Sequence, residues 1–487
     1  MTVKAATTST TTGLACAISA LCVASPALAQ RPQVTIAQGS LSGVEADGVE
    51  AFKGIPFAAP PVGALRWRAP QPAPAWQGLR DASDYGHDCV QNYTGFQPKG
   101  SEPAEDCLYL NIWRPHGVKQ KLPVLVWIYG GGFVNGSASR PIYQGHRLAS
   151  RNILVVNLNY RLGRFGTFAH PALTKADEDQ GKLGNYGYLD QIAALQWVQR
   201  NIAAFGGDPA NVTIFGESAG GMSVHNLLTS PLAKGLFKRA AIASGGDGHF
   251  IGTPTLAAAE AIGVDFGQSQ NIAGDDPQAL AKLRALPADA LRGDIKLGSV
   301  LANGKRSFSS PFPDGKITVD TLPAYTSGQF RHVPVMIGAT SGDMGGPSGM
   351  MIKGARDLAA LLSSSDVPTY YYRFSYVADA APTGKQAGAI HADDLPYYFD
   401  TADIKYDKDT KPADRKMGLI TSSYLVHFVK TGNPNGAGLP KWPRYQGKGG
   451  MMMDLSASGR AEAKREPISA QEPAPAAKSA PISPSAS

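Results

Sequence analysis

The chain has 487 residues, and its content of 43% hydrophobic and 17% charged residues excludes general disorder, because such a chain can bury a large core. Its formal net charge is +7, but Lys and Arg are scattered along the chain, which favours a slightly basic solvated surface over a nucleic-acid-binding face. Attraction to anionic substrates or cell envelopes is compatible with this charge but does not follow from it.

The N-terminus has the pattern of a signal peptide over residues 1–29. Lys4 is the only charge before an apolar stretch at residues 13–24, and Ala27-Leu28-Ala29 is a small-x-small cleavage site. The apolar stretch is short for a transmembrane helix; an uncleaved membrane anchor is the alternative. We therefore expect cleavage after about Ala29 and a secreted or periplasmic protein with no stable membrane insertion.

Two of the four cysteines lie in this predicted signal peptide, and the other two are Cys89 and Cys107. An oxidising compartment favours a disulfide between them; two unpaired buried thiols are the alternative. Two cysteines do not make a zinc site by themselves, and no H-E-x-x-H pattern supplies further ligands. No metal is therefore expected.

After short strands and turns over residues 34–60, apolar strands alternate with helical segments. Continuous apolar runs are typical of strands buried on both faces of a parallel sheet. Strands are predicted at residues 122–129, 153–160, 212–215, 240–243, 333–338 and 369–374, and helices at 188–204 and 219–228. We predict an α/β fold, with a mostly parallel central sheet and helices on both faces.

The rest of the chain follows a different pattern. Between residues 252 and 323 the strand signal gives way to helical and loop segments, which we expect to form an insertion that shapes a pocket. Residues 462–487 are rich in Ala, Pro and Ser and are expected to form a disordered tail. The folded domain is thus predicted over residues 30–461.

The sequence G-E-S-A-G at residues 216–220 lies between a predicted strand and a predicted helix. This context is typical of a nucleophile elbow, in which a strained turn exposes the serine hydroxyl and the following helix directs its N–H groups at a developing oxyanion. The motif alone also occurs by chance. We therefore predict that Ser218 is a nucleophile because the motif lies between a predicted strand and a predicted helix.

A second glycine-rich segment, Y-G-G-G-F at residues 129–133, follows another predicted strand. Glycine allows backbone N–H groups to approach a substrate closely. We assign an oxyanion hole to the N–H groups of Gly131, Gly132 and Ala219; an ordinary glycine-rich turn is the alternative.

In such a site the acid and the base follow the serine along the chain. His391 lies in a loop after the last predicted strand, whereas His427 lies inside a predicted helix and is interpreted as a surface or packing residue. Asp343 follows the strand at residues 333–338, at the edge where active sites of open sheets form. By pattern alone, Asp343 is equally well a solvated loop residue.

Together these motifs resemble the type-B carboxylesterase family, which includes cholinesterases and bacterial para-nitrobenzyl esterases. F-G-G-D-P at residues 205–209, continued through G-E-S-A-G, resembles its nucleophile signature, and E-D-C-L-Y-L-N-I-W at 105–113 resembles its second signature. Further similar stretches are F-K-G-I-P at 52–56, N-Y-R-L-G at 159–163, L-D-Q at 189–191 and T-G-N-P-N at 431–435. The resemblance covers residues 34–455 and implies the α/β-hydrolase fold, with insertions over the active site.

The resemblance implies a catalytic triad of Ser218, Asp343 and His391. The family acid is usually Glu, whereas the aligned position here is Asp343, which is one methylene shorter. The family's oxyanion loop more often begins with His, where this chain has Tyr129. We expect activity despite both differences, because a carboxylate still orients the imidazole and the loop acts through backbone N–H groups.

The resemblance also implies structural pairs. One is a disulfide between Cys89 and Cys107. The others are buried ion pairs, with independent surface charges as the alternative, and they join Arg66 to Glu105 and Arg161 to Asp190. Ser244 is expected behind the triad.

The expected reaction is hydrolysis of a small-molecule carboxylic ester through an acyl-enzyme, with no metal or organic cofactor. Because the base must be neutral, activity is expected at neutral to alkaline pH, rising from about pH 6.5. The alternative is a catalytically silent, cholinesterase-like binding protein; such relatives lose the serine or the histidine, and this chain keeps both. The natural ester, and the choice between monomer and homo-oligomer, do not follow from the sequence.

Overall fold

The computed structural model describes residues 1–10, 31–92, 95, 98–118, 121–249, 253–301, 307–381 and 388–467. The chain divides into two units, Met1–Arg31 and Pro32–Ser487. In the first unit, residues 1–10 form no helix or strand, and the rest of the predicted signal peptide lies outside the described residues. All the elements that follow belong to the second unit.

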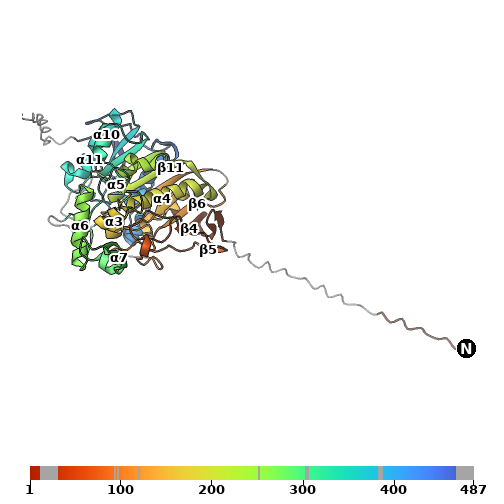
Figure 1. The fold of residues 1–487 in the computed structure, drawn as a ribbon. Coiled ribbons are helices and arrows are strands. Elements are labelled where there is room, and N and C mark those ends of the chain that lie inside the picture. The colour runs from red at the N-terminus through yellow and green to blue at the C-terminus, as the bar shows by residue number, and fades with distance from the viewer. Residues whose placement is uncertain are drawn as a thin grey trace, which may run out of the picture. The chain divides into compact units, whose positions relative to one another are not determined.

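Within the described residues, the second unit is built on an eleven-stranded sheet (Figure 1). From edge to edge its strands are β16 (Ala461–Arg465), β15 (Met451–Leu455), β14 (Thr369–Phe374), β13 (Val335–Thr340), β12 (Arg239–Ala243), β11 (Gly207–Glu217), β7 (Leu122–Ile128), β8 (Leu154–Leu158), β6 (Tyr109–Pro115), β4 (Val49–Pro56) and β3 (Val44–Ala46). The strands from β15 to β8 pair in parallel, and the outer strands pair antiparallel. Two small separate sheets contain β1 (Gln33–Ile36), β2 (Gly39–Ser42) and β5 (Leu79–Asp81), and β9 (Thr167–Phe168) and β10 (Gly184–Asn185).

Helices cover the sheet (Figure 1). The helix α5 (Ala219–Thr229) packs on β11 and β12, α11 (Met350–Ser364) packs on β13 and β14, and α14 (Pro412–Thr431) packs on β7 and β11. Every residue of β8, β13 and β14 is buried, so both faces of the sheet are covered there. The other helices include α1 (His146–Ala149), α2 (Gly163–Gly166), α3 (Pro171–Ala176), α4 (Tyr186–Asn201), α12 (Leu395–Tyr398) and α13 (Ala402–Tyr406). The predicted fold class is confirmed.

The apolar runs of the sequence became strands because both of their faces are buried. The strand β14 has its predicted bounds, and β7, β8, β12 and β13 differ from prediction by at most two residues at either end. The strand β11 begins five residues earlier than predicted, at Gly207. Its pairing with β7 shifts register between Gly207 and Val212, and this irregular stretch contains the polar Asp208 and Pro209, which hid the strand signal.

The segment predicted as an insertion contains helices and loops and, among its described residues, no strand. Its helices are α6 (Leu256–Ser269), α7 (Ala279–Ala285), α8 (Ala288–Arg292), α9 (Leu297–Leu301) and α10 (Thr321–Thr326). In the part of the chain that the structure describes, no helix combines the length and the hydrophobicity needed to cross a membrane.

The end of the folded domain differs from the predicted boundary at residue 461. The strand β16 begins at Ala461 and pairs with β15, so residues beyond the boundary belong to the sheet. Glu466 is also buried and accepts a hydrogen bond from the Tyr445 hydroxyl at 2.6 Å. This edge strand contains small and charged residues and no continuous apolar run, so its sequence resembles that of the predicted tail. Residues 468–487 lie outside the described residues.

The two predicted ion pairs are present; the pair of Arg161 and Asp190 is buried, and the pair of Arg66 and Glu105 is part-buried. Arg66 Nη2 lies 2.5 Å from Glu105 Oε1, and Arg161 Nη2 lies 2.7 Å from Asp190 Oδ1. In both pairs the guanidinium Nε also donates, at 2.8 Å, to the second carboxylate oxygen. This two-pronged geometry compensates part of the cost of removing charges from water.

The disulfide between Cys89 and Cys107 is also present, across a separation of 18 residues. We expect its removal in a Cys89→Ala, Cys107→Ala variant to lower the free energy of unfolding by about 3 kcal/mol, because the unfolded chain regains loop entropy. Urea unfolding of the variant and the oxidised parent measures the difference. Equal unfolding midpoints would contradict this expectation.

Candidate active site

Ser218 lies at the sharp turn between β11 and α5. Its backbone angles are φ +55° and ψ −124°, a sparsely populated region that costs about 1–3 kcal/mol. The turn requires glycine close by: a Cβ on Gly220 would lie 2.0 Å from the carbonyl oxygen of Ile128. The Ser218 N–H donates to the carbonyl oxygen of Ala243 at 2.9 Å. The turn therefore holds the serine in a defined place at the carboxyl edge of the sheet.

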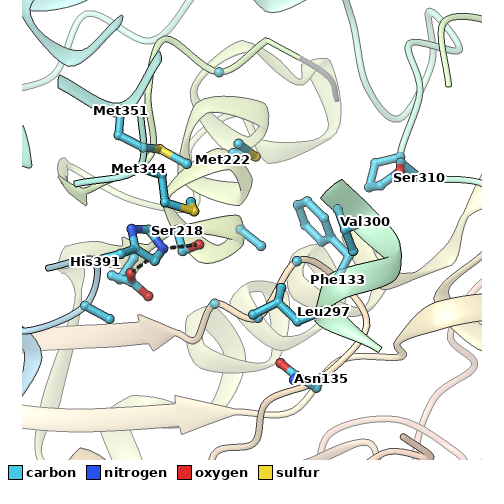
Figure 2. Close-up of a pocket in the computed structure, with 18 of the residues that line it drawn as sticks. Phe133, Asn135, Ser218, Met222, Leu297, Val300, Ser310, Met344, Met351 and His391 are labelled. Carbon is cyan, nitrogen blue, oxygen red and sulfur yellow. Dashed lines mark hydrogen bonds and ion pairs between the residues drawn. The ribbon is translucent and has the colours of Figure 1, made fainter. Parts of the chain in front are cut away.

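His391 bridges Ser218 and Asp343 (Figure 2). Its Nε2 lies 2.9 Å from Ser218 Oγ, and its Nδ1 lies 2.7 Å from Asp343 Oδ1. The three side chains follow three different parallel strands of the sheet, β11, β13 and β14, whose carboxyl ends meet at one edge. The structure thus brings together the three residues that the sequence named.

The histidine loop is tied to the loop that carries the acid. The Ala389 N–H donates to Ser341 Oγ at 3.1 Å, and the Gly342 N–H donates to the Ala389 carbonyl oxygen at 2.7 Å. Further along, Lys405 Nζ donates to Asp393 Oδ1 at 3.0 Å. The position of the imidazole therefore depends on contacts made by residues on both sides of it.

Asp343 is fully buried and accepts several hydrogen bonds. Its Oδ2 accepts from Ser244 Oγ at 2.6 Å and from Thr340 Oγ1 at 3.0 Å, and its Oδ1 accepts from the Met344 N–H at 2.8 Å. Burial acts to raise its pKa, but the hydrogen bonds from His391, Ser244 and Met344 outweigh burial and hold the pKa of Asp343 below its usual value. The shorter acid reaches the imidazole at normal hydrogen-bond length, and the predicted contact of Ser244 is present.

Two further buried carboxyl groups, Glu217 and Asp394, act electrostatically on the imidazole. Glu217 Oε1 lies 3.2 Å from His391 Nε2, and Asp394 accepts a hydrogen bond from the Tyr372 hydroxyl at 3.2 Å. Burial raises the pKa of Glu217 to about 7 and that of Asp394 to about 8. For His391, burial acts to lower the pKa, but the negative charge of Glu217 and the hydrogen bond to Asp343 outweigh burial and raise the pKa to about 9.

These charges predict the pH dependence of any reaction that needs neutral His391. Because the pKa of the imidazole is raised, activity should increase with pH along a limb whose midpoint lies above about 6.5, the ordinary imidazole value. Glu217→Gln removes a neighbouring negative charge, so the midpoint should move to lower pH. The pH profile of kcat/KM on a 4-nitrophenyl ester measures this shift, with Glu45→Gln on the exposed strand β3 as control. A midpoint that stays in place or rises would contradict the expectation.

The glycine-rich segment after β7 borders Ser218. Gly131 has φ +110°, which favours glycine, and no hydrogen bond is donated by the N–H groups of Gly131, Gly132 and Ala219 to another group within the described residues. The segment starts from a fixed peptide, because the Tyr160 hydroxyl donates to the Tyr129 carbonyl oxygen at 2.8 Å and the two rings stack. Tyr129, which begins this segment, is thus a packing residue, and the N–H groups beyond it are available to an oxyanion.

A cavity of about 260 Å³ lies over Ser218 and His391. In Figure 2, Met222, Met344 and Met351 group on one side of the serine, and Phe133, Leu297 and Val300 lie on the other. Leu297 and Val300 belong to α9, so the insertion shapes the pocket as predicted. In the described part of the chain, no group of three His, Cys, Asp or Glu residues is suited to hold a metal ion.

Comparison with known proteins shows the family to which the chain is similar. The carboxylesterase family model matches residues 30–353 and 348–471. The fumonisin B1 esterase of Sphingopyxis macrogoltabida is 34% identical over 490 residues, which cover 87% of this chain and 86% of that protein. The para-nitrobenzyl esterase of Bacillus subtilis (strain 168) is 34% identical over 477 residues, which cover 85% of this chain and 92% of that protein.

Solved structures agree as well. A PNB esterase structure matches with a TM-score of 0.78 at 30% identity, covering 90% of this chain and 98% of that chain. The chain belongs to the carboxylesterase family. It is therefore a carboxylic ester hydrolase with an α/β-hydrolase fold, and the predicted family is confirmed.

Reasoning from the sequence missed several residues of this carboxylesterase site. Glu217 carried a weak signal, since it directly precedes Ser218, and Asp394 lies three residues after His391. His249 was not named from the sequence, yet it lines the cavity. Arg140 carried no signal, because only the folded chain brings it to the cavity.

Proposed function

We propose that this carboxylesterase hydrolyses small-molecule esters through an acyl-enzyme on Ser218, with His391 as general base and Asp343 as the group that orients it. The observation that carries the proposal is the continuous hydrogen-bonded series from Asp343 through His391 to Ser218 beneath an open cavity. Nucleophile, base and orienting acid within hydrogen-bond distance form the arrangement that acyl transfer needs.

The steps follow from these positions. Ser218 Oγ attacks the ester carbonyl carbon while His391 Nε2 takes the hydroxyl proton. The N–H groups of Gly131, Gly132 and Ala219 stabilise the oxyanion of the tetrahedral intermediate. The C–O bond to the alcohol then breaks, and the alkoxide leaves with the proton from the imidazole. Water attacks the acyl-enzyme by the same route and releases the carboxylic acid and the serine.

The proposal includes export of the protein to the periplasm or the exterior of the cell. The small-x-small site at Ala27-Leu28-Ala29 and the preceding apolar stretch support cleavage there. The disulfide between Cys89 and Cys107 supports an oxidising compartment. Expression of the full chain in a bacterial host, followed by mass analysis of the purified protein, tests the cleavage. A mature protein that still carries residues 1–29 would contradict it.

Two measurements on purified protein test the reaction. The parent should hydrolyse short-chain and medium-chain 4-nitrophenyl esters, and an organophosphate probe should label one peptide, which contains Ser218. Ser218→Ala should lose the label, whereas Ser150→Ala, at the end of α1, should keep it. A parent with neither turnover nor a label on Ser218 would instead indicate a silent binding protein.

A further inference from the structure

One permanent cation, Arg140, lines the cavity that contains Ser218 and His391. Among the described residues of the cavity wall, the other ionisable side chains are carboxyl, imidazole or phenol groups, and most of the wall is apolar. Arg140 is half-buried, and its Nε has no contact with solvent. Because a guanidinium stays protonated at all physiological pH values, it gives this wall a fixed positive charge.

Arg140 lies on a segment that is held in place on both sides. Before it, the Ala138 N–H donates to Asn159 Oδ1 at 2.9 Å, and Ser139 Oγ donates to Asp88 Oδ2 at 3.0 Å. After it, the Tyr143 carbonyl oxygen accepts from Asn157 Nδ2 at 2.6 Å. A charge on such an anchored segment is pre-organised, so that little conformational entropy is lost when a ligand binds to it.

The positive charge reaches the nucleophile's surroundings. Arg140 acts to lower the pKa of Glu217, the residue that precedes Ser218, although burial dominates and raises that pKa. It acts in the same direction on Tyr129, at the start of the glycine-rich segment, where burial again dominates. Between mostly apolar walls such a field is weakly screened.

We propose that Arg140 binds a carboxylate carried by the ester, so that this enzyme prefers acidic esters to neutral esters of the same shape. The inference rests on the proposed esterase function. The substrate class consists of half-esters of di- or polycarboxylic acids and of esters whose alcohol part bears a carboxyl group. A planar guanidinium matches a carboxylate with two parallel hydrogen bonds, which a neutral substrate does not offer.

Two matched pairs of substrates test the proposal. In the first, the charge lies on the acyl side: 4-nitrophenyl hydrogen adipate is compared with 4-nitrophenyl 6-methylheptanoate. In the second it lies on the alcohol side: 4-carboxyphenyl butyrate is compared with 4-carbamoylphenyl butyrate. Values of kcat/KM are measured for the parent, Arg140→Gln, Arg140→Lys and the control Arg147→Gln. Arg147 pairs with Asp403 at 2.6 Å and is absent from the cavity wall, so its variant loses the same charge elsewhere.

We expect Arg140→Gln to lower kcat/KM by about 10- to 100-fold on the acidic member of at least one pair, mainly through KM, and by less than about threefold on the neutral member. The pair that responds shows which side of the ester carries the carboxylate. Arg140→Lys should keep part of the preference, and Arg147→Gln all of it. The preference should also weaken as salt is added.

Several results would overturn the proposal. A parent that hydrolyses the neutral esters without preferring either acidic partner would refute the role of Arg140 and leave the esterase function standing. An equal loss on acidic and neutral members in Arg140→Gln would show a purely structural role. A parent that hydrolyses none of the four esters would refute the proposed function, and this inference with it.

Discussion

Ser218→Ala and His391→Ala should each lower kcat by about 10⁶-fold, and the double variant should be no worse than either single variant. The reason is that the two groups act as one unit: the hydroxyl is a poor nucleophile until the imidazole, 2.9 Å away, takes its proton. A residual rate of about 10³–10⁴ over water should persist, because the N–H groups of Gly131, Gly132 and Ala219 still stabilise the oxyanion.

Steady-state rates on 4-nitrophenyl butyrate measure these losses, and circular dichroism with thermal unfolding shows that each variant is folded. Ser150→Ala is the matched serine control and should keep the parent rate. A Ser218→Ala protein that retains a tenth of the parent rate would mean that another group is the nucleophile. A strongly additive double variant would mean that the two side chains act independently.

Asp343→Asn should lower kcat by about 10⁴-fold. The amide would turn an N–H toward the imidazole or leave Nδ1 without a carboxylate, so the tautomer that presents a free Nε2 to Ser218 is no longer favoured. The loss should be large because the carboxylate is fully buried and accepts from Ser244, Thr340 and Met344 as well as from His391. Because this carboxylate is buried away from solvent, water does not take over its hydrogen bond with the imidazole in the variant.

Two further variants, Asp343→Glu and Asp394→Asn, serve as comparisons for Asp343→Asn. Asp343→Glu keeps the charge and should be more active than Asp343→Asn, although its extra methylene must be fitted into a filled space. Asp394→Asn changes a second buried carboxyl near His391, but burial raises the pKa of Asp394 to about 8, so this group is mostly neutral at pH 7. Asp394→Asn should therefore cost far less. Equal effects at the two aspartates would contradict the assignment of Asp343.

The strands were the most predictable part of the fold. Runs such as residues 335–339 are apolar on both faces, and only a strand covered on both sides buries every residue of such a run. The irregular start of β11 and the edge strand β16 escaped prediction. Asp208 and Pro209 interrupt the first, and the second carries charged residues on its exposed positions. The start of β11 pairs with β7, far earlier in the chain, whereas β16 pairs with the neighbouring strand β15; in both cases the pairing is not visible in the strand's own sequence pattern.

The site divides in the same way. The sequence alone predicted Ser218 as the nucleophile, because the glycine motif between a strand and a helix is local, and it named His391 and Asp343 as candidates through their order after parallel strands. Only the tertiary structure decided that Asp343 reaches the imidazole, that Glu217 lies beside it, and that Arg140 and the methionines line one cavity. The physical reason is that a motif is read from neighbours along the chain. The electrostatic field at the site and the shape of its cavity depend instead on groups that are distant in the sequence. Loops whose conformation the sequence pattern does not predict bring those groups together.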